Sequence, residues 1–65
     1  MNLLVNGEQT FFAHVTTVSD LISALKIQGN IAVEINREIV SRSAFDRYQL
    51  TDGDQVEIVT AIGGG

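Results

Sequence analysis

The sequence predicts a small α+β domain in which one helix packs on a mixed sheet of four to five strands. Several short segments alternate apolar with polar residues or are rich in β-branched and aromatic residues, as strands are. Only one stretch, residues 18–28, has apolar residues at helical spacing. The predicted order is therefore β-β-α-β, a short element and a final strand, and one helix against one sheet belongs to the α+β class.

The chain is expected to open with a β-hairpin. Residues 2–6 form the first predicted strand, and Asn6-Gly7 follows it. Asn-Gly is a strong hairpin signal because both residues tolerate a positive φ. Residues 10–14 are β-prone and form the predicted returning strand.

A helix is predicted over residues 18–28. Thr17 has the chemistry of an N-cap, and Asp20 stands at the third helical position, where an acid completes a capping box. Gly29-Asn30 is the expected stop. The apolar residues at i, i+3, i+4 and i+7, which form the stripe that faces the sheet, are Val18, Leu21, Ile22 and Leu25.

The second half of the chain adds the remaining strands. Residues 31–36 alternate apolar and polar side chains, as a half-buried strand does, and residues 36–38 form a turn before extended structure resumes at 39–40. Residues 43–48 have mild helical character, with Phe45 and Tyr48 as anchors. A tight turn at 52–54 leads into the last strand, 55–62.

The last strand runs directly into Gly63-Gly64-Gly65, so we divide the chain into a domain at 1–62 and a flexible glycine tail at 63–65. Folding does not require such a run, because glycine has no side chain to bury and loses much backbone freedom when ordered. A strand without Cβ atoms can thread a narrow channel in a partner, and a terminal Gly65 offers an unhindered carboxylate. A frayed or artificially added end is the alternative.

Composition excludes several function classes. The 65 residues carry 8 acidic and 4 basic side chains, a net charge of −4, which argues against a nucleic-acid partner. No cysteine is present, and no apolar run approaches the roughly 20 residues of a membrane span. We expect a protein of the cytoplasm, without contact to a membrane, whose negative charge serves solubility rather than a basic partner.

The body of the chain shows no convincing active site. His14 is the only histidine, and without cysteines or acids at ligand spacing a metal site is not expected. No serine has an evident histidine base, and no glycine loop precedes a helix that could hold a phosphate. If Gly65 reacts, it reacts as a substrate whose carboxylate is first adenylated from ATP. Sulfur would then give a thiocarboxylate and an amine would give an amide, and the single lysine, Lys26, makes carrying the more natural role.

A series of segments spread over the chain carries a family resemblance. They are residues 3–8, 18–22, 31–40, Phe45, 52–59 and Gly64-Gly65. In order, spacing and terminal position they resemble the ThiS family, the sulfur carriers of thiamin biosynthesis. The resemblance implies a minimal ubiquitin-like β-grasp fold.

The resemblance also implies a set of reactions and partners. A ThiF-like activating enzyme would adenylate the Gly65 carboxylate using its own ATP, so this chain would be no enzyme and would bind no cofactor itself. Sulfur from a cysteine desulfurase relay would convert the adenylate to a thiocarboxylate. A ThiG-like thiazole synthase would accept the sulfur, and Gly63 and Gly64 would lie in the partner's channel.

Two alternatives stay open at this point. The small subunit of molybdopterin synthase has the same tail and a similar fold, although it tends to be longer. The chain could also be a non-catalytic β-grasp binding module in which the tail is incidental. In either case Val59 and Ala61, on the face of the last strand opposite Val56 and Ile58, could form an apolar docking surface with part of the opening hairpin.

Overall fold

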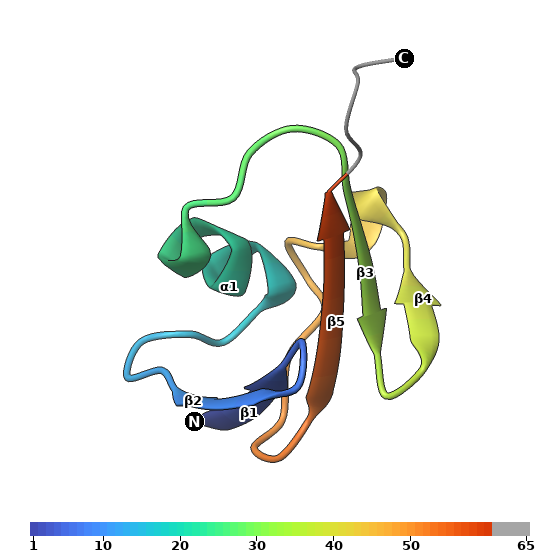
Figure 1. The fold of residues 1–65 in the computed structure, drawn as a ribbon. Helices are drawn as coiled ribbons and strands as arrows, with labels where there is room; N and C mark the ends of the chain where they lie inside the picture. Colours follow the sequence, from blue (N-terminus) through green and yellow to red (C-terminus); the bar gives the residue numbers. More distant parts are fainter. Residues whose placement is uncertain (61–65) are drawn as a thin grey trace.

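The architecture comes from a computed structural model, which describes residues 1–60 (Figure 1). The chain order confirms the predicted order, with the extended segment after the 36–37 turn forming a fifth strand. Residues 61–65, and with them the predicted boundary between the domain and the tail, lie outside the described residues. The elements are β1 (Asn2–Val5), β2 (Glu8–Phe11), α1 (Val18–Leu25), β3 (Ile31–Ile35), β4 (Glu38–Val40), the 3₁₀ turn η1 (Arg42–Ala44) and β5 (Gln55–Thr60).

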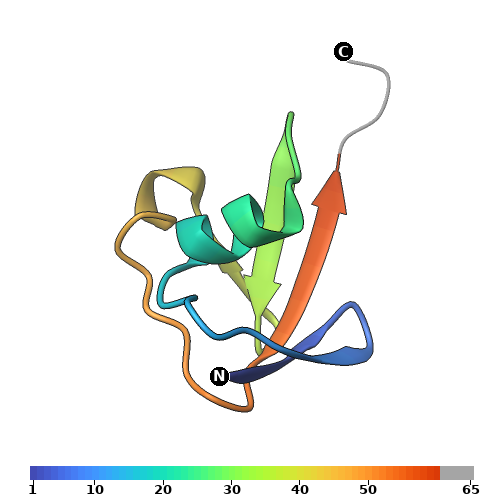
Figure 2. The same cartoon turned by 90° about the vertical axis from the view of Figure 1, so that its left-hand side faces the viewer.

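The five strands form one mixed sheet in the order β2-β1-β5-β3-β4. β5 pairs in parallel with β1 and antiparallel with β3, while the two hairpin pairs are antiparallel. The last strand therefore occupies the centre of the sheet, beside the first strand. α1 packs on one face (Figure 2), and within residues 1–60 no helix covers the opposite face, which we call the open face.

The core lies between α1 and the sheet. Val18 and Leu21 of the predicted helical stripe are fully buried, and Ile22 and Leu25 are half-buried against the same cluster. The predicted alternation of β3 is confirmed, because Val33 and Ile35 are buried and Ile31 is half-buried against the core. In β5, Val56 and Ile58 point into the same core. The buried core residues are Leu3, Val15, Val18, Leu21, Val33, Ile35, Val40, Leu50, Val56 and Ile58.

The opening hairpin and its returning strand form, but the predicted bounds of that strand, 10–14, were wrong. The two-residue turn at Asn6-Gly7 places Glu8 directly opposite Val5, so β2 begins two residues earlier than expected. The assigned strand β2 ends at Phe11, which faces Asn2, the first residue of β1. One further residue is still paired, because the Phe12 N–H donates to the Met1 carbonyl at 2.8 Å and the Met1 amino group donates to the Phe12 carbonyl at 2.9 Å. Residues 13–14 lie outside this pairing.

The helix starts where the sequence predicted and ends earlier. The Thr17 side chain accepts a hydrogen bond from the Asp20 N–H, and the Asp20 carboxylate accepts from the Thr17 N–H, which is a complete capping box. The predicted end at residue 28 was wrong. Lys26 adopts a left-handed φ of 57°, and its N–H donates back to the Ser23 carbonyl, which closes the helix without Gly29.

The segment after β4 fastens the helix start to the sheet. The carbonyls of Phe45 and Tyr48 accept hydrogen bonds from the N–H groups of Ser19 and Val18. Both aromatic side chains are half-buried against the core, so their predicted role as anchors is confirmed. These bonds satisfy helix-terminal donors that have no partner within the helix.

Asp20 also gives the helix start a pH dependence. Backbone hydrogen bonds from Thr17, and then from Thr16, lower the pKa of the Asp20 carboxyl below its usual value of 3.8. A carboxyl with a lowered pKa stabilises the folded state at pH values above its usual pKa. That contribution is lost as the pH falls through the folded-state pKa.

We therefore expect Asp20→Asn to unfold at a lower urea concentration than the unchanged chain near neutral pH, because the cap loses its charge. The gap should narrow as the pH falls below about 4, where the native carboxyl also becomes protonated. Urea titrations of both proteins followed by circular dichroism at several pH values would measure it. A gap that stays constant down to about pH 2.5 would contradict the charge-based account.

The β3–β4 turn contains a residue poorly suited to its backbone. Asn36 and Arg37 have φ values of 51° and 72°, both in the left-handed region. The two central residues of a type I′ turn need this conformation, and glycine is strongly preferred at the second. Arg37 has a Cβ atom and bears the strain that the first hairpin avoids with Gly7.

Arg37→Gly should stabilise the fold by about 0.5–1 kcal/mol, the relief of strain less the entropy cost of glycine. Chemical unfolding measures the change. Arg37→Ala is the matched control, because it removes the same side chain and charge but keeps the strained φ. Equal stabilisation by both variants would show that the arginine side chain, rather than the backbone, was responsible.

Candidate functional site

The described part of the chain contains no group of three side chains that could hold a metal ion. His14, the single histidine, is exposed in the loop after β2. Within residues 1–60 no helix has the length and apolar character that crossing a bilayer requires.

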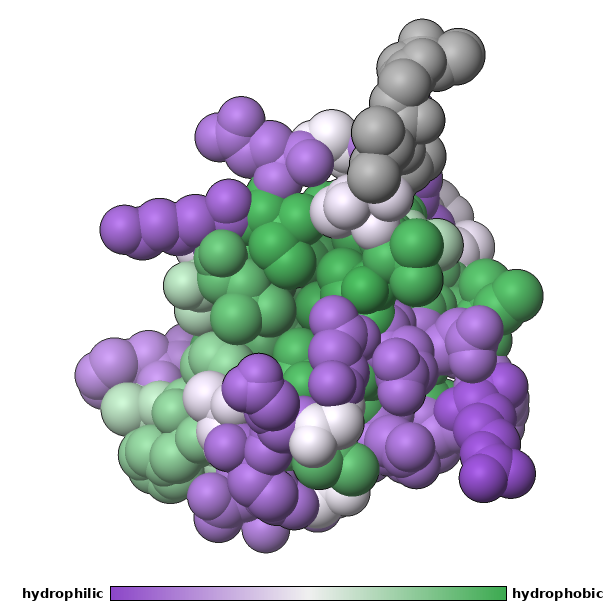
Figure 3. All heavy atoms as spheres, viewed as in Figure 1, coloured by the Kyte–Doolittle hydropathy of each residue, from purple (hydrophilic) through white to green (hydrophobic). Residues whose placement is uncertain are grey.

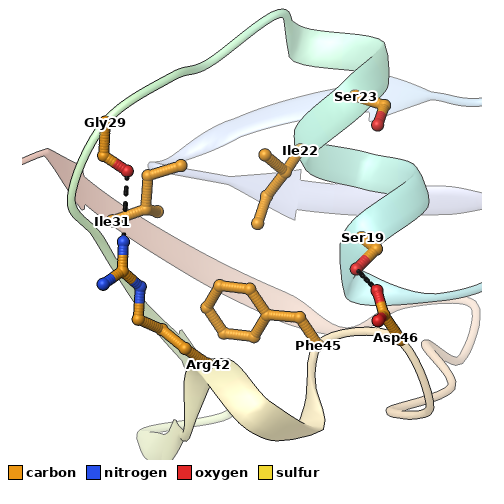
Figure 4. Close-up of a pocket in the computed structure, with 8 residues that line it drawn as sticks. All are labelled: Ser19, Ile22, Ser23, Gly29, Ile31, Arg42, Phe45 and Asp46. Carbon is orange, nitrogen blue, oxygen red and sulfur yellow. Dashed lines mark hydrogen bonds between the residues drawn. The ribbon is translucent and has the colours of Figure 1, made fainter.

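An open pocket of about 380 Å³ lies between α1, the loop before β3 and η1 (Figure 4). Three of its polar side chains, those of Ser19, Asp46 and Arg42, take part in hydrogen bonds. The Ser19 hydroxyl donates to an Asp46 carboxylate oxygen at 2.5 Å, and the Arg42 guanidinium donates to the Gly29 carbonyl and the Asn30 side chain. Ser19 therefore faces an acid rather than a histidine base, and the pocket shows no activated nucleophile.

β5 is the element that leads to the predicted tail. It pairs with all five residues of β3, from Val56 opposite Ile35 to Thr60 opposite Ile31. On its other side β1 pairs only with Gln55 and Val56. The predicted tail residues Gly63, Gly64 and Gly65, and Ala61 of the predicted docking surface, lie outside the described residues.

A side chain extends the β1–β5 ladder by one step. The Asn6 amide oxygen accepts a hydrogen bond from the Ile58 N–H at 2.7 Å, and the Asn6 amide nitrogen donates to the Ile58 carbonyl at 3.2 Å. The amide thus imitates the peptide group that β1 would supply if it continued. Asn6 serves the turn through its positive φ and also fixes β5 two residues before Thr60.

Sequence reasoning recognised Asn6 only as a turn residue. Its second role could not be read from the sequence, because Ile58 is 52 positions away and becomes a neighbour only through the parallel pairing. The fastening matters for function, because a rigid support positions a terminal segment more precisely than a loop would.

Val59 lies on the open face, opposite in direction to the buried Val56 and Ile58. Its side chain is 63% exposed and its cross-strand neighbour is Ala32. With Asn30 and Ile31 these two residues line a shallow hollow of about 210 Å³. Figure 3 shows apolar side chains gathered around the upper half of β5 and polar side chains below them. Docking of a partner at Val59 stays a prediction.

Asn6→Gly separates the two roles of Asn6, because glycine keeps the positive φ and removes both amide bonds. We expect a loss of about 1–2 kcal/mol in unfolding free energy and faster hydrogen exchange of the Ile58 amide. Asn6→Asp retains the acceptor oxygen but not the donor. Its unfolding free energy and its Ile58 exchange rate should therefore lie between those of Asn6→Gly and those of the unchanged chain. Unchanged exchange at Ile58 in Asn6→Gly would show that the side chain does not fasten β5.

Comparison with known proteins identifies a family that this chain matches. The model of the ThiS family matches residues 3–65. The sulfur carrier protein ThiS of Bacillus subtilis is 34% identical over 97% of this chain and 98% of its own length. A thiazole synthase of Paramagnetospirillum magneticum is 42% identical over the whole chain, which spans only 20% of that protein.

The fold is matched as well. The crystal structure of a thiamine biosynthesis protein (ThiS) from Geobacter metallireducens has a TM-score of 0.85 and 40% sequence identity, and each chain covers 100% of the other. At this identity and coverage the likeness confirms the predicted ubiquitin-like β-grasp fold.

Proposed function

The chain belongs to the ThiS family, the sulfur carrier proteins of thiamin biosynthesis, and we propose that Gly65 carries the sulfur as a terminal thiocarboxylate. The observation that supports this most directly is the extent of the family match, which continues through the glycines to residue 65. The position of β5 agrees with it. The central strand, paired on both sides, is the element that leads to the proposed reactive end.

The proposed chemistry starts from an unreactive group. A carboxylate is a poor electrophile because it has no good leaving group. A carboxylate oxygen of Gly65 attacks the α-phosphorus of ATP, and pyrophosphate leaves. A sulfur nucleophile at the oxidation level of sulfide then attacks the acyl carbon, AMP leaves, and a C–S bond replaces the C–O bond.

In this proposal the chain is a co-substrate on which other proteins act. Its own contribution is to present Gly65 from a fastened strand, while Gly63 and Gly64 leave room for the partner's channel. A ThiF-like activating enzyme supplies ATP and the site for adenylation. A desulfurase relay supplies sulfur from cysteine as a persulfide, and thiols that are oxidised to a disulfide reduce it to the level of sulfide. Because other proteins supply these groups, the proposed role requires neither a catalytic base nor an anion-binding site in the carrier itself.

Thiazole synthase is the proposed acceptor. The relative from P. magneticum that is named a thiazole synthase contains a stretch similar to this entire chain and is about five times its length. A carrier-like segment within a protein of that name supports a working pair of carrier and synthase. No comparable observation favours the molybdopterin alternative.

Incubation of the full chain with ATP, an activating enzyme and a sulfur donor should add the mass difference between sulfur and oxygen at Gly65. Intact and fragment mass spectrometry measure the gain, and a reaction without ATP is the control. Gly64→Ala should react about tenfold or more slowly, because a methyl group displaces the reacting carboxylate in a narrow channel. Its thermal stability should be unchanged, since the described core ends at Ile58.

An unmodified chain in the presence of a demonstrably active enzyme would contradict the assignment of Gly65. Normal activation of Gly64→Ala would contradict only the steric part of the proposal.

A further inference from the structure

The open face of the sheet carries two carboxylates directly opposite each other. Glu34 of β3 and Glu57 of β5 are partners in the strand register, and both side chains are exposed. Their sequence neighbours, Val33 and Ile58 among them, are buried on the helix side, so both carboxylates point to the open face. Like charges at directly opposed positions of antiparallel strands destabilise the pairing.

No basic side chain of the described residues pairs with either carboxylate, and this includes Arg37 at the tip of the β3–β4 turn. Arg42 donates to the Gly29 carbonyl and the Asn30 amide, and Arg47 donates to the Ser43 carbonyl. Lys26 follows α1 on the other side of the sheet. Within residues 1–60, neither Glu34 nor Glu57 takes part in a side-chain hydrogen bond. A repulsive pair that folding does not use indicates a role in recognition.

The surroundings of the pair are apolar. Ile39, the other cross-strand neighbour of Glu34, is 80% exposed. Val59 and Ala32 lie on the open face one step farther along the strands, at the hollow described above. A lysine or arginine suits such a surface, because its aliphatic stem can lie on apolar groups while its charged head reaches the carboxylates.

Geometry connects this face to the proposed reaction. The five residues after Thr60 span at most about 18 Å when fully extended. A protein that reacts with Gly65 must therefore come close to the end of β5, and Val59 and Glu57 lie within three residues of that end. Thiazole synthase is the acceptor proposed above, and a relative of that name contains a stretch similar to this chain.

We propose that thiazole synthase docks on the open face and places a lysine or arginine side chain between Glu34 and Glu57. This inference rests on the proposed function and adds to it the chemistry of the contact. The cation relieves a repulsion between Glu34 and Glu57 that is present in the free carrier. Binding is therefore favoured both by the new ion pairs and by the removal of this repulsion. The two carboxylates strengthen binding to the synthase, and they lower the folding stability of the free domain.

The test uses the full chain and purified thiazole synthase from the same organism. Binding is measured at about 20 mM and about 500 mM NaCl, because the screening length falls from roughly 20 Å to roughly 4 Å over that range. The variants are Glu34→Gln and Glu57→Gln. Glu38→Gln is the matched control: it makes the same charge change on the same hairpin, but Glu38 is opposite the buried Ile35 and so lies on the other side of the sheet.

At low salt each of the two variants should bind about three- to fivefold more weakly, and the difference should shrink at high salt. Glu38→Gln should bind as the unchanged chain does. Glu34→Gln and Glu57→Gln should also unfold at an equal or higher urea concentration, because the repulsion is gone. The combination of weaker binding and undiminished stability would distinguish recognition from damage to the fold.

Several results would overturn the proposal. They are unchanged binding of both variants at low salt, an equal loss in Glu38→Gln, lower stability of either variant, or weakened binding to the activating enzyme but not to thiazole synthase. The binding measurement needs no thiocarboxylate. A chain that gains no sulfur but shows the expected binding pattern would disprove the role of Gly65 and leave the docking contact standing.

Discussion

The structure depends on the parallel pairing of the first and last strands. β1 and β5 join the two ends of the chain at the middle of the sheet, and the remaining strands are added on either side. The backbone ladder between them covers only two residue pairs, Leu4 with Gln55 and Val5 with Val56. Asn6 lengthens it with a side-chain amide that binds the Ile58 peptide group on both its N–H and its C=O. A short contact between distant segments thus sets the direction in which β5 leads toward Gly65.

The two faces of the sheet have separate tasks. The helix face supplies nearly all the burial, and its side chains on α1, β3 and β5 form one cluster. The open face contributes little to that core and carries exposed apolar and acidic side chains instead. Because strand residues alternate between faces, every element that holds the fold together also presents groups to the outside. A chain of 65 residues can in this way combine a packed core with the docking surface that we propose.

Two local features lower the stability of the fold, one at the tip of a turn and one on the central strands. The left-handed Arg37 is at a turn tip, where the strain is confined to one residue. The Glu34–Glu57 pair lies on the central strands next to Val59, the exposed apolar residue nearest the end of β5. A small domain has little stability to spare, so a repulsion placed at its centre is more informative than one at its rim. This contrast is why the acidic pair, and not the turn, supports an interaction partner.

Local patterns in the sequence determined much of the fold and the proposed chemistry. The Asn6-Gly7 turn, the capping box at Thr17 and Asp20, and the alternation of Ile31, Val33 and Ile35 depend on neighbouring residues, so they could be predicted. The glycine tail and the family resemblance could also be recognised from the sequence, because they do not depend on how the chain packs.

Only the tertiary structure decided where β2 and α1 end, what Asn6 binds and which residues face Glu57. β2 ends at Phe11, opposite the Asn2 that begins β1. α1 ends at a left-handed Lys26, a conformation that a lysine in the sequence does not predict. Glu34 meets Glu57, and Asn6 meets Ile58, through strand register across 23 and 52 positions. Register is set by the packing of the whole core, which no local segment contains.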